Sequence, residues 1–312
     1  MNQQPTDITT ELTKELLKEK RASRKQGVFF KSLAVIYVGF ITLAFLVSFL
    51  GGSMGSDEPH VAIIPITGII KEGAEASANN LVEPIRDAFE EDNAVAIVLA
   101  INSPGGSPVQ SGYIYDEIIR LKLLHPEKKV YSVISDLGAS GGYYIAAAAD
   151  EIYANRASLV GSIGVTASGF GFVNLIDKVG VERRTYTSGS NKNFLDPFLA
   201  SNSDQGVFWS SVLGGVHEQF KDVVIQSRKG KIDIANKELF SGLIWNGEQA
   251  LKLGLIDGLE SAGSLSRDVI GEEEIRIYER KKTAVEQLLS PLKTEFKSTI
   301  DTLSTTGNYS LY

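Results

Sequence analysis

The sequence predicts an α/β protein with a parallel sheet, preceded by one transmembrane helix. Two observations lead to this prediction. A long uncharged apolar run lies near the start of the 312-residue chain, and strand-like apolar runs then alternate with glycine-rich turns and helical patterns. Near-continuous apolar strands separated by helices are typical of a parallel sheet that helices cover.

The transmembrane helix is predicted within residues 32–56, which carry no charged side chain. A run of about 20 apolar residues suffices to cross a bilayer. Residues 1–31 hold seven basic and four acidic side chains, so the positive-inside rule places this tail in the cytoplasm. We therefore expect a single-pass protein of the plasma (inner) membrane with an extracytoplasmic main domain. The alternatives are a cleaved signal peptide, disfavoured by the long charged leader, and a buried core helix, disfavoured by the asymmetric flanks.

The chain is expected to have four regions. These are a cytoplasmic tail (1–31), the anchor and its linker (32–56), the main domain (57–280) and an amphipathic tail (281–312). The net charge is −7 overall and +3 for the first region, so the remainder carries −10, which argues against a nucleic-acid partner. The chain has no cysteine, which excludes disulfides, thiolate nucleophiles and zinc sites with cysteine ligands.

Within the main domain, hydrophobic patterning predicts alternating strands and helices. Strands are expected at 60–70, 94–101, 129–134, 151–154, 162–165 and 272–279, and helices at 80–91, 110–124, 143–149 and 207–228. Two glycine-rich turns, 102–107 and 136–142, follow the second and third strands directly. Because ligands bind at the carboxyl ends of parallel strands, these turns are the expected site.

Ser140 is the candidate nucleophile because it lies directly after a strand and at the start of a helix. The free N–H groups and the positive end of a helix favour a developing oxyanion there. The N–H groups of Gly106 and Gly141, one from each turn, are placed to form an oxyanion hole. The alternatives are a serine that only caps the helix and two unrelated tight turns.

A serine nucleophile needs a base. The chain has only three histidines, His60, His125 and His217, and no turn positions any of them beside Ser140. A lysine is the remaining option, provided that its amine is neutral, which desolvation and nearby positive charge favour. Lys192 is the best candidate because it lies in a polar stretch, 188–198, with phenylalanines close by. The alternative is an exposed loop lysine.

Five segments in order resemble the bacterial signal peptide peptidase family of the SppA type. They are NSPGG (102–106), GASGGYY (138–144), GSIGV (161–165), S-G-x-x-K-x-x-x-D-P-F (188–198) and W-x-G-x-x-A-x-x-x-G-L-x-D (245–257). The resemblance spans about residues 60–260. The chain departs from the family in two respects: Leu243 stands after Gly242 where an arginine is frequent, and the domain is present once rather than as a tandem pair.

The resemblance implies a membrane-anchored serine–lysine peptidase with the repeated ββα superhelix of Clp protease and crotonase. It implies Ser140 as nucleophile, Lys192 as general base and Ser162 as the residue that orients the lysine, with Gly106 and Gly141 as the oxyanion hole. It implies no cofactor and no metal. The expected partners are peptides such as signal-peptide remnants, the lipid bilayer through residues 32–56, and further copies of the chain that share the active site.

Three other functions stay open. A Clp-like histidine triad requires His217, the only histidine after Ser140. A crotonase-type acyl-CoA enzyme keeps the oxyanion hole without needing Ser140 or Lys192. The third is a catalytically inactive membrane scaffold or peptide-binding protein on the same fold.

Overall fold

The computed structural model describes residue 13, residues 31–43 and residues 58–280. The chain divides into two compact units, Met1–Asp57 and Glu58–Tyr312. In the first unit residues 31–43 form a helix with exposed apolar side chains. Within the described residues, no helix has both the length and the apolar character needed to span a bilayer. Residues 44–56 of the predicted anchor and the predicted tail at 281–312 lie outside the described residues.

The second unit is built on a seven-stranded sheet, in which the strands follow the order β6-β5-β3-β2-β1-β7 and β4 also pairs with β3. The pairs β1–β2, β2–β3, β3–β4, β3–β5 and β1–β7 are parallel, whereas β6 is antiparallel to β5. The α/β fold with a mostly parallel sheet is therefore confirmed. The strands are β1 (His60–Thr67), β2 (Ala94–Ser103), β3 (Lys129–Ala139), β4 (Glu151–Ala154), β5 (Leu159–Gly161), β6 (Ile244–Asn246) and β7 (Ile275–Ile277).

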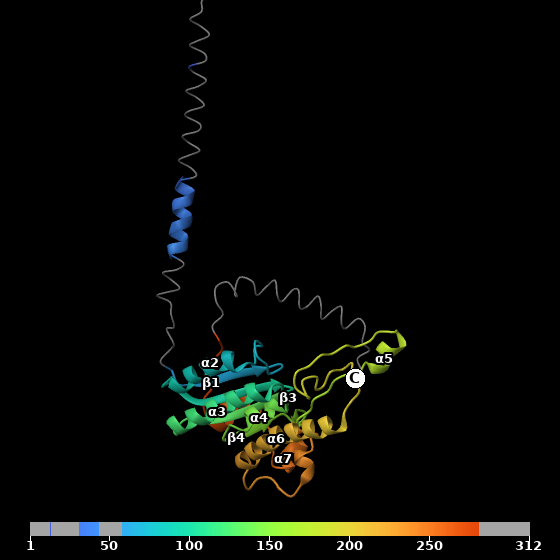
Figure 1. The fold of residues 1–312 in the computed structure, drawn as a ribbon. Helices are drawn as coiled ribbons and strands as arrows, with labels where there is room; N and C mark the ends of the chain where they lie inside the picture. Colours follow the sequence, from blue (N-terminus) through green and yellow to red (C-terminus); the bar gives the residue numbers. More distant parts are fainter. Residues whose placement is uncertain (1–12, 14–30, 44–57, 281–312) are drawn as a thin grey trace, which may run out of the picture. The chain divides into compact units, whose positions relative to one another are not determined.

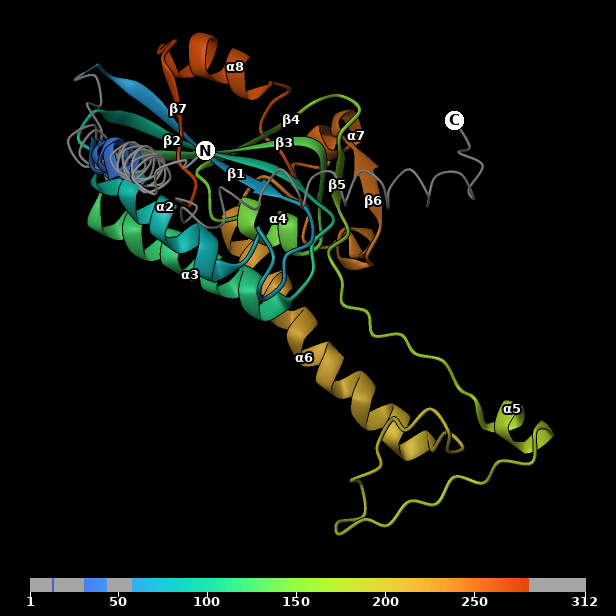
Figure 2. The same cartoon turned by 90° about the horizontal axis from the view of Figure 1, so that it is seen from above.

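Helices cover the sheet unequally on its two faces, as Figure 2 shows. Because side chains alternate along a strand, one face of the sheet joins the larger core with α2 (Ala78–Glu90), α3 (Pro108–Leu124), α4 (Gly141–Ala146) and α6 (Ser203–Ser227). The opposite face packs mainly against α8 (Ala262–Ser264) and the π-helical turn Leu265–Ile270. The other helices among residues 58–280 are α5 (Val173–Lys178), the 3₁₀ turn Lys237–Phe240 and α7 (Gly247–Lys252).

The long strand β3 brings the chain to the predicted site. Its first half pairs with β4 and its last three residues, Leu137–Ala139, pair with β5. The strand predicted at 162–165 is wrong, because β5 ends at Gly161. Gly161 and Ser162 have φ values of 109° and 50°, which a regular strand does not accommodate. The antiparallel strand β6 was not predicted.

An extended segment, residues 164–202, leaves the sheet after β5, and we call it the arm. It carries α5 and returns to the N-terminal end of α6, away from the sheet (Figures 1 and 2). No residue of the arm is buried, and several of its apolar side chains are largely exposed, including Phe170 (82%) and Tyr186 (92%). The first half of α6 continues this surface, since Val207 and Phe208 are also exposed.

Candidate active site

Ser140 lies in a strained turn between β3 and α4. Its φ of 51° and ψ of −122° match the first central position of a type II′ turn, where glycine is the usual residue. The backbone fixes this conformation on both sides: the Ser140 N–H donates to the Gly161 oxygen (2.8 Å), and the Ser140 oxygen accepts from the Tyr144 N–H (2.9 Å). A strained serine between a strand and a helix is the arrangement that exposes the hydroxyl of a nucleophile.

The two glycine-rich turns contact each other at this point. A Cβ placed on Gly105 would lie 2.7 Å from the Ser140 Cβ and 2.6 Å from the Gly141 nitrogen. A Cβ placed on Gly141 would lie 3.3 Å from the Gly106 nitrogen. The Gly106 and Gly141 N–H groups are therefore neighbours, one from each turn.

Both of these N–H groups are free of protein acceptors in the part of the chain that the structure describes. Gly141 is the first residue of α4, so its N–H has no acceptor within the helix. Ile70 donates to the Gly105 oxygen (2.9 Å) and accepts from the Ser107 N–H (2.7 Å), which turns the N–H of the intervening Gly106 away from Ile70. Two free donors side by side can stabilise one oxyanion.

Ser162 lies beside Ser140. Their predecessors Ala139 and Gly161 are register partners, so the two serines follow the paired ends of β3 and β5. Ser162 is half-buried, has a positive φ and donates its N–H to the Leu243 oxygen (2.7 Å). The structure therefore brings Ser140, Ser162, Gly106 and Gly141 together.

Lys192 is not part of this group within one chain. It lies exposed in the arm, in a turn closed by a hydrogen bond from its N–H to the Gly189 oxygen (3.1 Å). Among the described residues, no hydrogen bond or ion pair joins the Lys192 amine to any other group. A single chain thus presents the candidate nucleophile and the candidate base on separate elements.

The rings of the three histidines contact groups other than Ser140. The His60 Nε2 lies 2.9 Å from the Tyr278 hydroxyl, the His217 Nε2 lies 3.2 Å from the Ile163 oxygen, and the His125 ring packs on Phe89. These contacts do not favour a histidine triad at Ser140. Within residues 31–43 and 58–280, no group of three His, Asp or Glu side chains could hold a metal ion.

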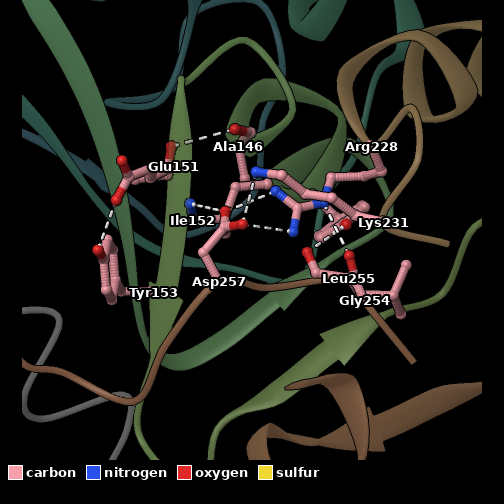
Figure 3. Close-up of polar contacts among 11 residues, drawn as sticks. Ala146, Glu151, Ile152, Tyr153, Arg228, Lys231, Gly254, Leu255 and Asp257 are labelled. Atoms are coloured by element: carbon pink, nitrogen blue, oxygen red, sulfur yellow. Dashed lines mark hydrogen bonds and ion pairs between the residues drawn. The ribbon is translucent and has the colours of Figure 1, made fainter. Parts of the chain in front are cut away.

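A buried ion pair joins the end of α6 to the segment after α7 (Figure 3). Arg228, 1% exposed, pairs with Asp257 at 2.6 Å and also donates to the Gly254 oxygen at 2.9 Å. Burial acts to raise the pKa of the Asp257 carboxyl. Hydrogen bonds from Arg228, Lys231 and the Ile152 N–H outweigh that effect and hold the pKa below its usual range. Sequence patterning did not single out Arg228, because no signal marks a buried arginine before its partner is placed.

Comparisons with known proteins identify relatives of the chain by sequence. The family model described as Peptidase family S49 matches residues 122–270. A Na(+)/H(+) antiporter NhaA of Brucella abortus is 42% identical over 69% of the chain, and the chain spans only 30% of that protein's length. The chloroplastic serine protease SPPA of Arabidopsis thaliana is 32% identical over 78% of the chain and 36% of its own length. A putative protease of Synechocystis is 32% identical over 65% of the chain and 71% of its own length.

Proposed function

Because the chain belongs to peptidase family S49, we propose that it is a membrane-anchored serine peptidase with a Ser140/Lys192 dyad. The observation that carries this proposal is the position of Ser140. It lies in a strained turn beside two free N–H groups, those of Gly106 and Gly141. Such donors stabilise the oxyanion of an acyl-transfer transition state, and losing one typically costs about 3–4 kcal/mol.

The proposed reaction passes through an acyl-enzyme. Neutral Lys192 takes the proton from the Ser140 hydroxyl as the oxygen attacks a peptide carbonyl carbon. The tetrahedral oxyanion accepts hydrogen bonds from Gly106 and Gly141. The Lys192 ammonium then protonates the leaving amine as the C–N bond breaks. Water, deprotonated by Lys192, attacks the acyl-enzyme, and the proton returns to Ser140 as the acid product leaves.

We assign Ser162 the role of holding the Lys192 amine toward Ser140. Its place at the end of β5, next to the end of β3, supports this role. Because Lys192 lies on the arm and not beside Ser140 within one chain, we propose that this lysine comes from a neighbouring subunit. The exposure of Lys192 on the arm supports this assembly, and so do the exposed apolar side chains of the arm and of α6. Contiguous exposed apolar surface is typical of an interaction site.

The proposed substrates are membrane-derived peptides such as signal-peptide remnants. The kinship with a serine protease SPPA supports a peptide substrate. We also propose that residues 32–56 anchor the chain in the plasma membrane with the peptidase domain on the extracytoplasmic side. The uncharged apolar run and the basic residues before it support this orientation. We further propose that the peptidase domain has the repeated ββα superhelix that the resemblance implies.

Labelling with a fluorophosphonate, which reacts with activated serines, tests the function directly. In the purified full-length chain we expect one adduct, at Ser140, and hydrolysis of an Ala- and Leu-rich peptide. Ser140→Ala should abolish both, Lys192→Ala should abolish hydrolysis, and Ser135→Ala, which changes an exposed serine on β3, should alter neither. A chain that gives no adduct and no hydrolysis would instead be an inactive scaffold.

A further inference from the structure

A buried hydroxyl joins the loop after β1 to the turn after β2, which carries the Gly106 N–H. Ser103, the last residue of β2, is 0% exposed. Its Oγ donates to the Gly68 oxygen at 2.6 Å and accepts from the Gly105 N–H at 3.1 Å. One side chain thus joins the loop after β1 to the turn after β2.

Backbone hydrogen bonds continue this connection. The Gly68 N–H donates to the Asn102 oxygen (2.9 Å), and Ile70 binds the backbone on both sides of Gly106. The Ser103 hydroxyl is, within the described residues, the one side-chain group that bonds to the backbone of residues 104–106. Residues 105 and 106 are glycines with φ values of 93° and 151°, so their own conformational preferences do not fix the turn.

Ser103 also contacts the second turn. A Cβ placed on Gly142 would lie 2.9 Å from the Ser103 oxygen and 3.3 Å from the Ser103 Cβ. Ser103 therefore lies between the segment that carries Gly106 and the segment that carries Ser140. A group in this place influences how the two oxyanion donors are directed relative to the nucleophile.

From these contacts we propose that Ser103 is a positioning residue for the peptidase reaction: its hydroxyl fixes the direction of the Gly106 N–H. This inference rests on the proposed function, since it assigns Gly106 to the oxyanion hole. Oxyanion stabilisation depends on donors aimed in advance at the place where charge develops. A turn freed from its tether would bind substrate normally and stabilise the transition state poorly.

Ser132 provides a matched control. It is also a serine with 0% exposure on a central strand, and its Oγ donates to the Ala146 oxygen at 3.2 Å. Ser132→Ala therefore removes a buried hydroxyl of the same kind without touching the Gly106 turn. Any effect that comes only from losing a buried hydrogen bond should appear in both alanine variants.

The test compares Ser103→Ala with Ser132→Ala in the full-length protein. For Ser103→Ala we expect kcat on a fluorogenic peptide to fall at least tenfold while KM stays within about twofold. The affinity for a peptide aldehyde, whose adduct with Ser140 carries the oxyanion, should fall by a similar factor. Ser132→Ala should keep both within about twofold. Ser103→Cys keeps the side-chain shape but its thiol forms only weak hydrogen bonds, so it replaces Ser103→Ala if the alanine variant does not fold.

The outcomes separate the two proposals. Equal kcat for the Ser103 and Ser132 variants, in an active wild-type background, overturns the positioning role and leaves the peptidase function intact. A kcat loss without weaker aldehyde binding also overturns it, since the oxyanion donors would then be undisturbed. A wild-type chain that neither hydrolyses peptides nor reacts at Ser140 overturns the proposed function, and the inference that rests on it falls as well.

Discussion

The Tyr143 phenol donates a 2.6 Å hydrogen bond to the backbone oxygen of Leu255, 112 positions later in the chain. Tyr143 lies in α4, three residues after Ser140, and its ring is completely buried. Burial raises the pKa of this phenol further above its usual value, which already keeps the hydroxyl protonated at neutral pH. The contact joins the helix behind the candidate nucleophile to the segment that Arg228 and Asp257 hold in place.

Tyr143→Phe should destabilise the protein by about 1–3 kcal/mol, because the buried Leu255 oxygen loses this donor. Urea unfolding of the full-length chain, followed by fluorescence, measures the loss. Tyr113→Phe is the control, since Tyr113 lies on α3 with 58% exposure and should change the unfolding free energy little. Equal unfolding midpoints for the two variants would contradict a stabilising role for the Tyr143 hydroxyl.

The Asp257 carboxylate should make stability depend on pH in the acid range. Its pKa is lower in the folded state than in the unfolded chain, where it is about 3.9. Its contribution is therefore complete above that value and is lost as the pH falls through the lower folded-state pKa. Asp257→Asn should flatten this part of the stability curve. At neutral pH it should cost about 3–5 kcal/mol, because Arg228 stays buried without its partner charge.

Thermal unfolding of wild type and Asp257→Asn across the acid range up to neutral pH measures this effect. Asp268→Asn is the control. Asp268 pairs with Arg267 at the surface, with both side chains more than half exposed, and such pairs contribute little. If the thermal stability of Asp257→Asn falls as steeply with decreasing pH as that of wild type, other carboxylates cause the pH dependence.

Gly105→Ala should abolish reaction at Ser140. The new methyl group would lie 2.6–2.8 Å from the Gly141 nitrogen, the Ser140 Cβ and the Ala139 oxygen, so the two turns must separate. Fluorophosphonate labelling measures the effect, and we expect at least a hundredfold slower reaction. Gly112→Ala on α3 is the control, since open space surrounds that position and alanine favours a helix by about 1 kcal/mol.

Mixing two inactive variants should restore activity if subunits share the site. In a mixed assembly, the Ser140→Ala chain supplies an intact Lys192 and the Lys192→Ala chain supplies an intact Ser140. Peptide hydrolysis after co-expression measures the recovery, and affinity tags on both chains verify that mixed assemblies form. Verified mixed assemblies with no activity would mean that the base does not come from a neighbouring chain.

Much of the fold could be predicted from sequence because its central strands contain long apolar runs. The run AVAIVLAI became β2, and residues 151–154 became β4 with the expected bounds. β6 was missed because three residues, Ile244–Asn246, are too few to show a pattern. The strand expected at 162–165 failed because Ser162 takes a positive φ, which local sequence did not reveal.

Sequence reasoning reached the Ser140 turn because glycine-rich turns at strand ends carry a clear signal. It could not place Lys192, since the arm has no buried residue that fixes its path against the sheet. It also passed over Ser103, which reads as an ordinary residue of the NSPGG turn. Only the three-dimensional structure shows that its hydroxyl bonds to a loop 35 positions earlier.

The φ of 51° at Ser140 is a backbone conformation that lowers the stability of the folded chain when a serine adopts it. A glycine there would adopt the same torsion without steric cost and would remove the hydroxyl at the same time. The strained backbone at position 140 is therefore a steric cost that glycine would avoid, and under the proposed function the serine is kept there because its hydroxyl is the nucleophile.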